Sequence, residues 1–161
     1  MERTIKKVKY ERKSGAVTIE FSTVSMKQEI DSKLKSNDKP VAEFIELLDN
    51  LRPHVEEICA LPDEYCKDAE IRGVSFSNTN DIMGAVITAL IPVPTANAPV
   101  VINTPHLPES PYSEGGESPI LSFEAVNILK RLKSEAAKYL DGQRDPGNQT
   151  SLDFTEEDDP S

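Results

Sequence analysis

Alternating apolar and polar positions mark the first 24 residues. Residues 4–10 and 16–24 both follow a period of two, and Lys13-Ser14-Gly15 separates them. The clearest apolar positions of the second segment are Val17, Ile19 and Phe21. Because successive side chains of a strand point to opposite faces, and because glycine suits a tight turn, this pattern predicts a β-hairpin with one buried face. Residues 25–39 are polar and rich in lysine, and they predict a loop or a short irregular helix.

A helical period replaces the strand period after residue 39. Pro40 suits the start of a helix, and Asp38 is the expected N-cap. Apolar side chains then recur every three or four residues, at Val41, Phe44, Ile45, Leu48 and Leu51. Pro53 has no backbone N–H to donate, so we expect a kink or a restart there. Val55, Ile58 and Leu61 continue the apolar face. The pattern predicts an amphipathic helix in two segments.

Three further strands are predicted in the middle of the chain. They cover residues 69–77, 82–91 and 98–103. The second is almost continuously apolar, which is typical of a strand buried on both faces. Residues 78–81, Asn-Thr-Asn-Asp, are turn formers between the first two strands. Residues 104–118 are rich in Pro, Ser, Gly and Glu and predict a loop.

A second amphipathic helix follows this loop. Ser122 is its expected N-cap and Gly142 its expected end. Its apolar face consists of Ala125, Leu129, Leu132, Ala136 and Tyr139. The order of elements predicts an α+β fold, with an antiparallel or mixed sheet of about five strands and two main helices packed on one face. We expect one domain over residues 1–141 and a disordered acidic tail over residues 142–161.

The net charge of −10 is unevenly distributed. Residues 1–39 hold ten Lys or Arg against six Asp or Glu, whereas residues 40–161 hold eight against twenty-two. A chain this acidic is unsuited to wrapping duplex DNA, because basic side chains must displace counterions from the phosphates. The basic positions near the start can still contact a nucleic-acid backbone locally, namely Lys6, Lys7 and Lys9. The alternative is a solvated strand face whose lysines prevent self-association of an edge strand.

Hydropathy and cysteine content exclude three further classes. No stretch approaches the roughly 18 uninterrupted apolar residues of a membrane-spanning helix. The basic start of the chain lacks the apolar stretch that follows in a signal peptide. Two cysteines are too few for a disulfide scaffold. We therefore expect a cytoplasmic protein with no membrane partner.

Enzyme signatures are largely absent. Cys59 and Cys66 have no histidine at a spacing that completes a zinc site, and Cys59 is expected to be a small core residue. His106 follows an expected strand, where a catalytic group could sit, but the sequence does not identify a partner for it. Arg72, beside Gly73, is a candidate ion-pair or binding residue. The expectation is a protein that is not an enzyme and has no metal or cofactor.

A short segment near the C-terminus carries the most specific signal. Residues 149–154 read Gln-Thr-Ser-Leu-Asp-Phe. The segment resembles the linear motif by which bacterial polymerases and repair proteins dock on the DNA polymerase sliding clamp. The residues that occupy positions of this pattern are Gln149, Ser151, Leu152 and Phe154. Such a peptide binds by placing apolar anchors in a preformed pocket while the glutamine makes directional hydrogen bonds.

Two weaker resemblances concern the body and the end of the chain. Residues 72–76, 85–90 and 103–107 resemble segments of uncharacterised small proteins encoded by phages and prophages. Residues 153–160 are similar to the acidic tip of bacterial single-stranded-DNA-binding proteins, but the chain does not end in the Pro-Phe of that tip. The resemblances together imply a phage or bacterial accessory protein of DNA replication or repair, which docks on the clamp and either recruits or inhibits. The alternative function is single-stranded nucleic-acid binding by the basic hairpin.

Overall fold

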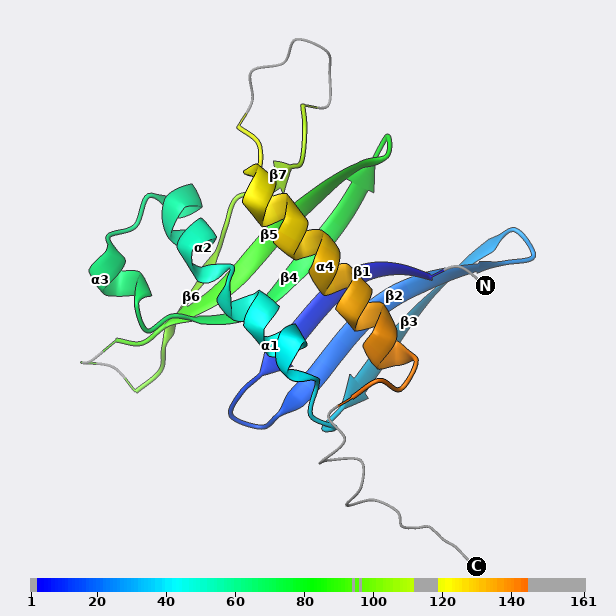
Figure 1. Cartoon of the computed structure of the whole chain (residues 1–161), viewed down its shortest axis with the longest axis horizontal. Coiled ribbons are helices and arrows are strands. Elements are labelled where there is room, and N and C mark those ends of the chain that lie inside the picture. The colour runs from blue at the N-terminus through cyan, green and yellow to red at the C-terminus, as the bar shows by residue number, and fades with distance from the viewer. Residues whose placement is uncertain (1–2, 94, 96, 112–118, 145–161) are drawn as a thin grey trace, which may run out of the picture.

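The computed structural model describes residues 3–93, 95, 97–111 and 119–144. The elements are β1 (Arg3–Glu11), β2 (Ala16–Ser25), β3 (Gln28–Ser36), α1 (Ala42–Asp49), α2 (Arg52–Cys59), α3 (Asp63–Cys66), β4 (Glu70–Thr79), β5 (Ile82–Ile91), β6 (Val100–Asn103), β7 (Leu107–Pro108) and α4 (Phe123–Leu140). Within the described residues, seven strands form one antiparallel sheet in the order β3-β2-β1-β4-β5-β6, with β7 also paired to β5 (Figure 1). The chain therefore has the expected α+β fold.

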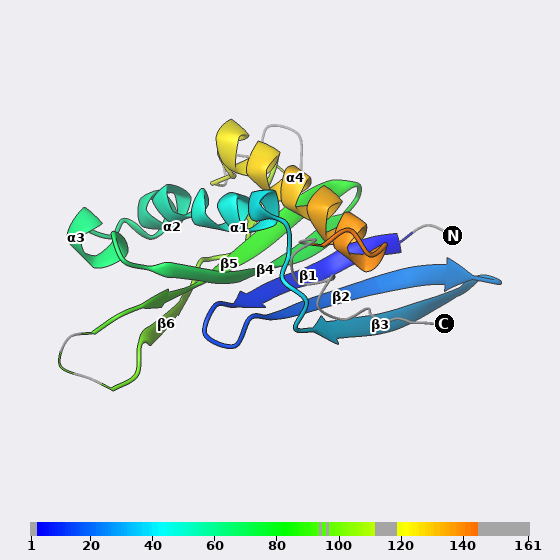
Figure 2. The same ribbon diagram turned by 60° about the horizontal axis from the view of Figure 1, so that its bottom comes forward.

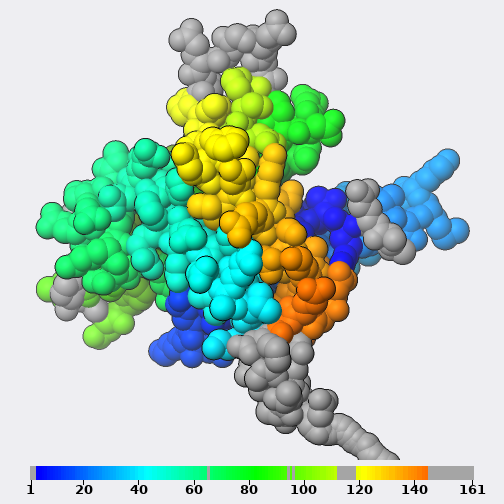
Figure 3. Space-filling model, in the orientation of Figure 1, coloured from blue at the N-terminus to red at the C-terminus, as the bar shows by residue number. Residues whose placement is uncertain are grey.

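The helices lie on one side of the sheet. Figure 2 shows α1, α2 and α4 above the strands, and Figure 3 shows α1 and α4 side by side over that face. A single apolar core fills the space between the two layers. Its fully buried members include Val8, Ile19, Phe44, Leu48, Ile71, Ile87, Leu129 and Leu132. Burying a side chain of this size contributes about 1.5–3 kcal/mol, so this layer supplies most of the stability.

Several local predictions are confirmed. The first two segments form the hairpin β1–β2, and the helix after residue 40 divides at Pro53, because α1 ends at Asp49 and α2 begins at Arg52. Ser122 caps α4, since its hydroxyl accepts a hydrogen bond from the Ala125 backbone N–H at 3.1 Å. Gly142 follows the helix with φ +95°, a left-handed conformation that suits glycine.

The predicted cap Asp38 is wrong. The N-cap of α1 is Val41, which has extended backbone geometry and makes no side-chain capping bond. Residues 39–41 separate Asp38 from the first turn of the helix, so its carboxylate is too early in the chain to cap it. The Asp38 carboxylate instead accepts a hydrogen bond from Arg144 Nη1 at 2.6 Å.

The interpretation of residues 25–39 as a loop or helix is also wrong. Residues 28–36 form the edge strand β3, paired with β2 along its whole length. Edge strands need few apolar side chains and are often protected by charge, which hid the period of two in this segment. The two-residue strand β7, inside the predicted loop, is a further addition. These two strands raise the number from about five to seven.

The predicted tail begins within the described residues and continues beyond them. Residues 142–144 close the C-terminal end of α4, and residues 145–161 lie outside the described residues. Among the helices that the structure describes, none is both long enough and apolar enough to span a lipid bilayer.

Candidate functional site

The side of the sheet away from α1 and α4 is polar, and we call it the open face. Strand register places side chains of neighbouring strands in rows across this face. The first row consists of Lys35, Thr18, Lys9, Gly73, Thr88 and Asn103, from β3 to β6. The second row consists of Lys33, Glu20, Lys7, Ser75 and Val86. The two rows therefore bring lysines of β1 and β3 onto one surface.

The three lysines singled out from the sequence differ in their surroundings. Lys6 Nζ lies 3.3 Å from a carboxylate oxygen of Glu29 and 3.3 Å from one of Asp31, and hydrogen bonds to these two acids raise the pKa of Lys6. Lys7 and Lys9 form no ion pair with any residue that the structure describes. The charge of Lys6 is thus balanced locally, whereas the charges of Lys7 and Lys9 are available to a ligand.

An irregularity in β1 sets this arrangement. The register between β1 and β2 shifts between Ile5 and Lys7, so that Lys6 is an extra residue in the ladder. A β-bulge of this kind changes which face the following side chains reach. Ile5 and Val8 both face the core although they are three residues apart. The bulge therefore allows Lys7 and Lys9 to lie on the open face while the apolar positions of β1 stay buried.

A hollow of about 310 Å³ opens in the first row, and we call it the Gly73 hollow. Lys7, Lys9 and Arg72 line it together with polar and apolar side chains of β5 and β6. A Cβ atom on Gly73 would lie 2.4 Å from the Val8 carbonyl oxygen. The backbones of β1 and β4 thus approach too closely for a side chain at this position, and the missing side chain leaves the floor of the hollow open.

Arg72 reaches the open face through a second bulge. The β4–β5 register shifts between Ile71 and Gly73, and Arg72 is the extra residue. Its Nη1 donates to Glu11 at 3.2 Å, and its Nε lies 3.6 Å from a carboxylate oxygen of Glu70. The Nε atom is buried and has no hydrogen-bond partner among the described residues. The guanidinium is therefore held in place by two acids while one of its donors remains unused.

The carboxylate of Glu11 is itself polarised by its neighbours. A hydrogen bond from the Ser14 hydroxyl, at 2.6 Å, is the main cause that lowers the pKa of Glu11, and the positive charge of Arg72 adds to it. Glu11 therefore stays ionised at neutral pH, which keeps the Arg72 guanidinium anchored at this end of the hollow.

The opposite side of the hollow combines polar and apolar groups. Thr88 Oγ1 donates to Asn103 Oδ1 at 2.6 Å, which leaves the Asn103 amide nitrogen as a donor. Leu90 and Val101 supply an apolar wall, and Val101 is 58% exposed. The two rows themselves contain no aromatic side chain, because Tyr10 faces the core, where its ring meets Phe44 edge-on at 6.5 Å between centroids. Tyr10 is therefore not available for base stacking on the open face.

His106 and Arg72 do not share a pocket. The His106 ring lies over Gly84, and its Nε2 is 2.7 Å from Ser77 Oγ. Arg72 lines the Gly73 hollow, and His106 is not among the residues that line it. The histidine fixes the segment before β7 against the sheet, and the structure does not unite the two candidate residues in one site.

The cysteines are likewise placed as structural residues. Cys66 is buried and Cys59 half-buried, and burial raises the pKa of both thiols. A raised pKa leaves the thiol protonated and unreactive near neutral pH. In the part of the chain that the structure describes, no three His, Cys, Asp or Glu side chains are grouped so that they could hold a metal ion.

A second set of binding residues, separate from those of the open face, was predicted in the tail. Gln149, Ser151, Leu152 and Phe154 lie outside the described residues, so their interpretation as a docking motif stays a prediction. Lys33 and Lys35 were not identified from the sequence, because residues 25–39 were predicted to form a loop or a short irregular helix. Their alternation with Ser32 and Leu34 was the signal that could have identified β3 and its outward-facing lysines.

Comparison with known proteins adds no family to this geometry. The chain matches no protein-family model, no curated protein sequence and no solved structure. Function must therefore be inferred from the open face and from the sequence of the tail.

Proposed function

We propose that the protein is a non-enzymatic, cytoplasmic module that binds single-stranded nucleic acid on its open face. The observation that supports this proposal is the pair Lys7 and Lys9 at the centre of a polar sheet surface, with no ion pair to any described residue. Two positions apart on one strand, their Cα atoms are about 7 Å from each other. Lys33 and Lys35 extend the positive surface on β3. The two rows together hold four lysines against one glutamate, Glu20, and this net positive surface fits a phosphate backbone.

The composition of the face limits the strength and the selectivity of binding. Without aromatic side chains in the two rows, bases cannot gain the stacking energy that single-strand binders commonly use. Binding then rests on phosphate contacts, and it should be modest, independent of sequence and sensitive to salt. If about three phosphates are neutralised, the logarithm of the affinity falls with the logarithm of the salt concentration with a slope of about −2.

Fluorescence anisotropy with a labelled oligothymidine tests the proposal. We expect the affinity of the full chain to fall about 20-fold between about 50 and 200 mM salt, as three phosphate contacts require. The double variant Lys7→Gln/Lys9→Gln should bind more weakly and reduce the slope to about −0.7.

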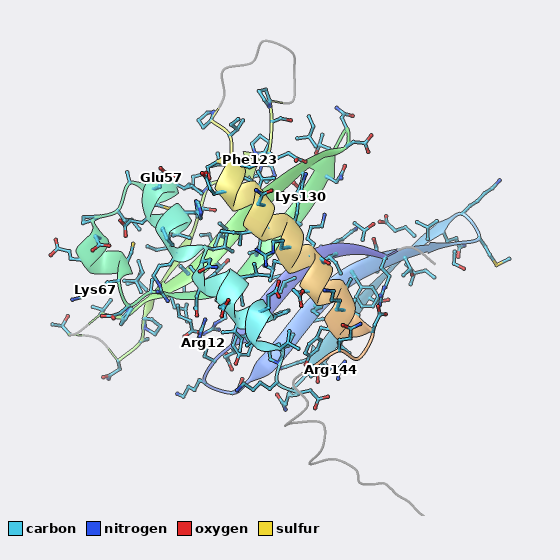
Figure 4. All side chains as sticks on the ribbon, viewed as in Figure 1. Arg12, Glu57, Lys67, Phe123, Lys130 and Arg144 are labelled. Atoms are coloured by element: carbon cyan, nitrogen blue, oxygen red, sulfur yellow. The ribbon has the colours of Figure 1, made fainter. Side chains whose placement is uncertain are left out.

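A matched control removes the same charge elsewhere. Lys27 and Lys67 are exposed and lie in the β2–β3 turn and after α3, away from the two rows. In Figure 4, Lys67 is seen at the α3 end of the molecule. The variant Lys27→Gln/Lys67→Gln should bind nearly as the wild type does. If the chain does not bind the oligonucleotide, or if both double variants lose affinity equally, the proposal is wrong.

A second candidate function rests on the tail. We also propose that residues 149–154 dock on the bacterial sliding clamp, as their resemblance to the clamp-binding motif implies. Arg144 is the last described residue before them, and it is fixed to the body, since its guanidinium bonds Asp38 and lies 4.3 Å from the centre of the Tyr139 ring (Figure 4). The motif begins five residues later, within at most about 18 Å of that point. Docking would then hold the open face close to the DNA that the clamp encircles.

Titration of the full chain into purified clamp tests this second function. The variant Gln149→Ala/Phe154→Ala should lose binding, because it removes the amide and one apolar anchor. The control Thr150→Ala/Thr155→Ala changes neighbouring positions and should leave binding intact. Equal behaviour of the two variants, or no binding by the wild type, would exclude clamp docking without bearing on the open face.

A further inference from the structure

We propose that the Gly73 hollow is a subsite that seats one phosphate group together with its attached nucleoside. This inference deepens the proposed function, since it names the part of a nucleic acid that the open face would recognise individually. The volume of about 310 Å³ is at the lower end of the range of small-molecule sites and fits one nucleotide. The hollow therefore has the size of one nucleotide and lies in the row that carries Lys9.

Arg72 also supplies hydrogen-bond donors that no described residue uses. A guanidinium carries five N–H donors, and the described residues accept one of them, through the bond from Nη1 to Glu11. The Nε is buried beside Glu70, so the donors that a ligand in the hollow can reach are those of Nη1 and Nη2. A phosphate oxygen is an acceptor that suits a guanidinium and forms a short, charge-assisted bond with it. Glu11 and Glu70 hold the group in position without occupying all of these donors.

The cations that line the hollow contribute to anion binding in different ways. Glu11 and Glu70 compensate the charge of Arg72, so this residue mainly contributes a donor with a fixed direction. Lys7 and Lys9 form no ion pair with a described residue, although Glu20 lies opposite Lys7 on β2 and the charge of Lys9 acts on Glu11. A phosphate therefore meets two lysines of β1 outside any ion pair with a described residue, and oriented donors from β4.

The far wall distinguishes a nucleotide from inorganic phosphate. Leu90 and Val101 offer apolar contact to a sugar or base, and the Asn103 amide nitrogen offers a hydrogen bond. Inorganic phosphate would use only the cationic side. The hollow should therefore bind a nucleoside monophosphate more tightly than it binds inorganic phosphate, and a nucleoside without phosphate least tightly.

Nuclear magnetic resonance of the full chain tests the subsite with three probes: thymidine monophosphate, inorganic phosphate and thymidine. We expect the monophosphate to shift the backbone amide signals of Gly73, Thr88 and Asn103 in a saturable way, with at least a fivefold advantage over inorganic phosphate. The variant Arg72→Lys keeps the charge but removes the planar set of Nη donors, and it should weaken binding of the monophosphate at least fivefold. Thr88→Leu narrows the hollow and should also weaken binding of the monophosphate. Thermal unfolding of each variant checks that it is folded.

The same variants separate this inference from the proposed function. If oligothymidine binding still depends on Lys7 and Lys9, but the monophosphate causes no saturable shift at the hollow or binds both variants normally, the subsite is wrong and the proposed function stands. If the monophosphate binds as expected but oligothymidine does not bind, the proposed function is wrong and the subsite stands. Two oligothymidines, one with a 5′-phosphate and one with a 5′-hydroxyl group, identify which phosphate the subsite binds. Tighter binding of the 5′-phosphorylated oligonucleotide would support the subsite and identify a terminal phosphate as its ligand. If both oligonucleotides bind equally and Arg72→Lys weakens the binding of both, the subsite is supported and its ligand is an internal phosphate.

Discussion

The two faces of the sheet use alternate residues of the same strands for different purposes. On β1, Val8 is completely buried against the helices, whereas its neighbours Lys7 and Lys9 lie on the open face. On β5, Ile87 is buried in the core and Thr88 lies on the open face. A shift of one position thus exchanges core for surface. Substitutions at alternate positions of one strand should therefore affect either stability or ligand binding, depending on the face that the side chain occupies.

The largest effect on stability is expected on the side of the sheet that α1 and α4 cover. Leu129 of α4 is fully buried in the core, so Leu129→Ala removes apolar contacts and leaves a cavity. We expect a loss of about 2–5 kcal/mol in the free energy of unfolding, measured by chemical denaturation. The exposed neighbour Asn127 provides the control, and Asn127→Ala should change stability by no more than about 0.5 kcal/mol. A small loss at Leu129 would mean that α4 does not pack on the sheet as described.

Two glycines on the open face give the next effect. A Cβ on Gly73 would meet the backbone oxygen of Val8, which cannot move without distorting β1, and we expect Gly73→Ala to cost about 1–3 kcal/mol. A Cβ on Gly84 would meet side-chain atoms of His106 and Ser77, which can turn away. Gly84→Ala should therefore cost less. Thermal and chemical unfolding of the two variants would contradict this explanation if the order were reversed.

A half-buried carboxylate next to β7 provides a pH-dependent effect. The Glu109 carboxylate accepts the Met83 backbone N–H at 2.7 Å and lies 3.1 Å from Lys130 Nζ. The bond from the Met83 N–H is the main cause that lowers the pKa of Glu109, and Lys130 lowers it further. A carboxyl group with a lowered pKa stabilises the folded state above its ordinary pKa, and this stabilisation is lost as the pH falls through the folded-state pKa.

Glu109→Gln should consequently destabilise the protein by about 1 kcal/mol at neutral pH, as expected for the loss of one charge-assisted hydrogen bond. The difference from the wild type should shrink as the pH falls from the ordinary pKa of a glutamate through the lower folded-state pKa, because the wild-type carboxyl then becomes protonated as well. Denaturation at several pH values measures this. A difference that is constant with pH would show that the charge of Glu109 does not contribute.

The two long hairpins allow a comparison at their turns. Met26 and Lys27 have φ of 51° and 66°, and Asn80 and Asp81 have φ of 54° and 65°. Both turns thus need two left-handed residues, which Asn, Asp and Gly adopt most easily. Only the second turn has suitable residues. Met26→Asn/Lys27→Gly should raise the free energy of unfolding by about 0.5–1 kcal/mol, whereas Asp81→Gly, which gives the second turn the same Asn-Gly pair, should change it less. Equal gains would show that the turn residues do not limit stability.

These particular residues also explain how far the sequence could predict the fold. The strong periods of β2 and α4 and the nearly continuous apolar run of β5 were sufficient, because each segment has apolar side chains that must be buried. The strand β3 was missed because the turn before it has Met26-Lys27 in place of turn formers, and because its edge position tolerates charge on one face. Asp38 was misassigned because its true partner, Arg144, lies 106 positions away.

The candidate site could be predicted only in part for a similar reason. Lys7 and Lys9 were singled out as basic strand residues, and Arg72 beside Gly73 as a candidate binding residue. Their meeting in one hollow depends on the β1–β4 pairing and on two bulges, each of which adds a basic residue. Register between distant strands leaves no local pattern in the sequence. Only the structure could therefore show that Lys6 is paired and that Lys7 and Lys9 are not.

The smallest effect on stability is expected where the effect on binding is largest. Lys7→Gln/Lys9→Gln removes two charges from a surface that also holds Lys33 and Lys35, so relief of repulsion should offset any loss of packing by the lysine stems. We expect the free energy of unfolding to change by no more than about 0.5 kcal/mol in chemical denaturation, as it should for the control Lys27→Gln/Lys67→Gln. The two double variants would then be equally stable and differ only in oligonucleotide affinity and its salt dependence. If the first variant alone lost more than about 1 kcal/mol in the free energy of unfolding, Lys7 and Lys9 would stabilise the sheet. Residues on the open face of β1 would then contribute to stability as well as to binding.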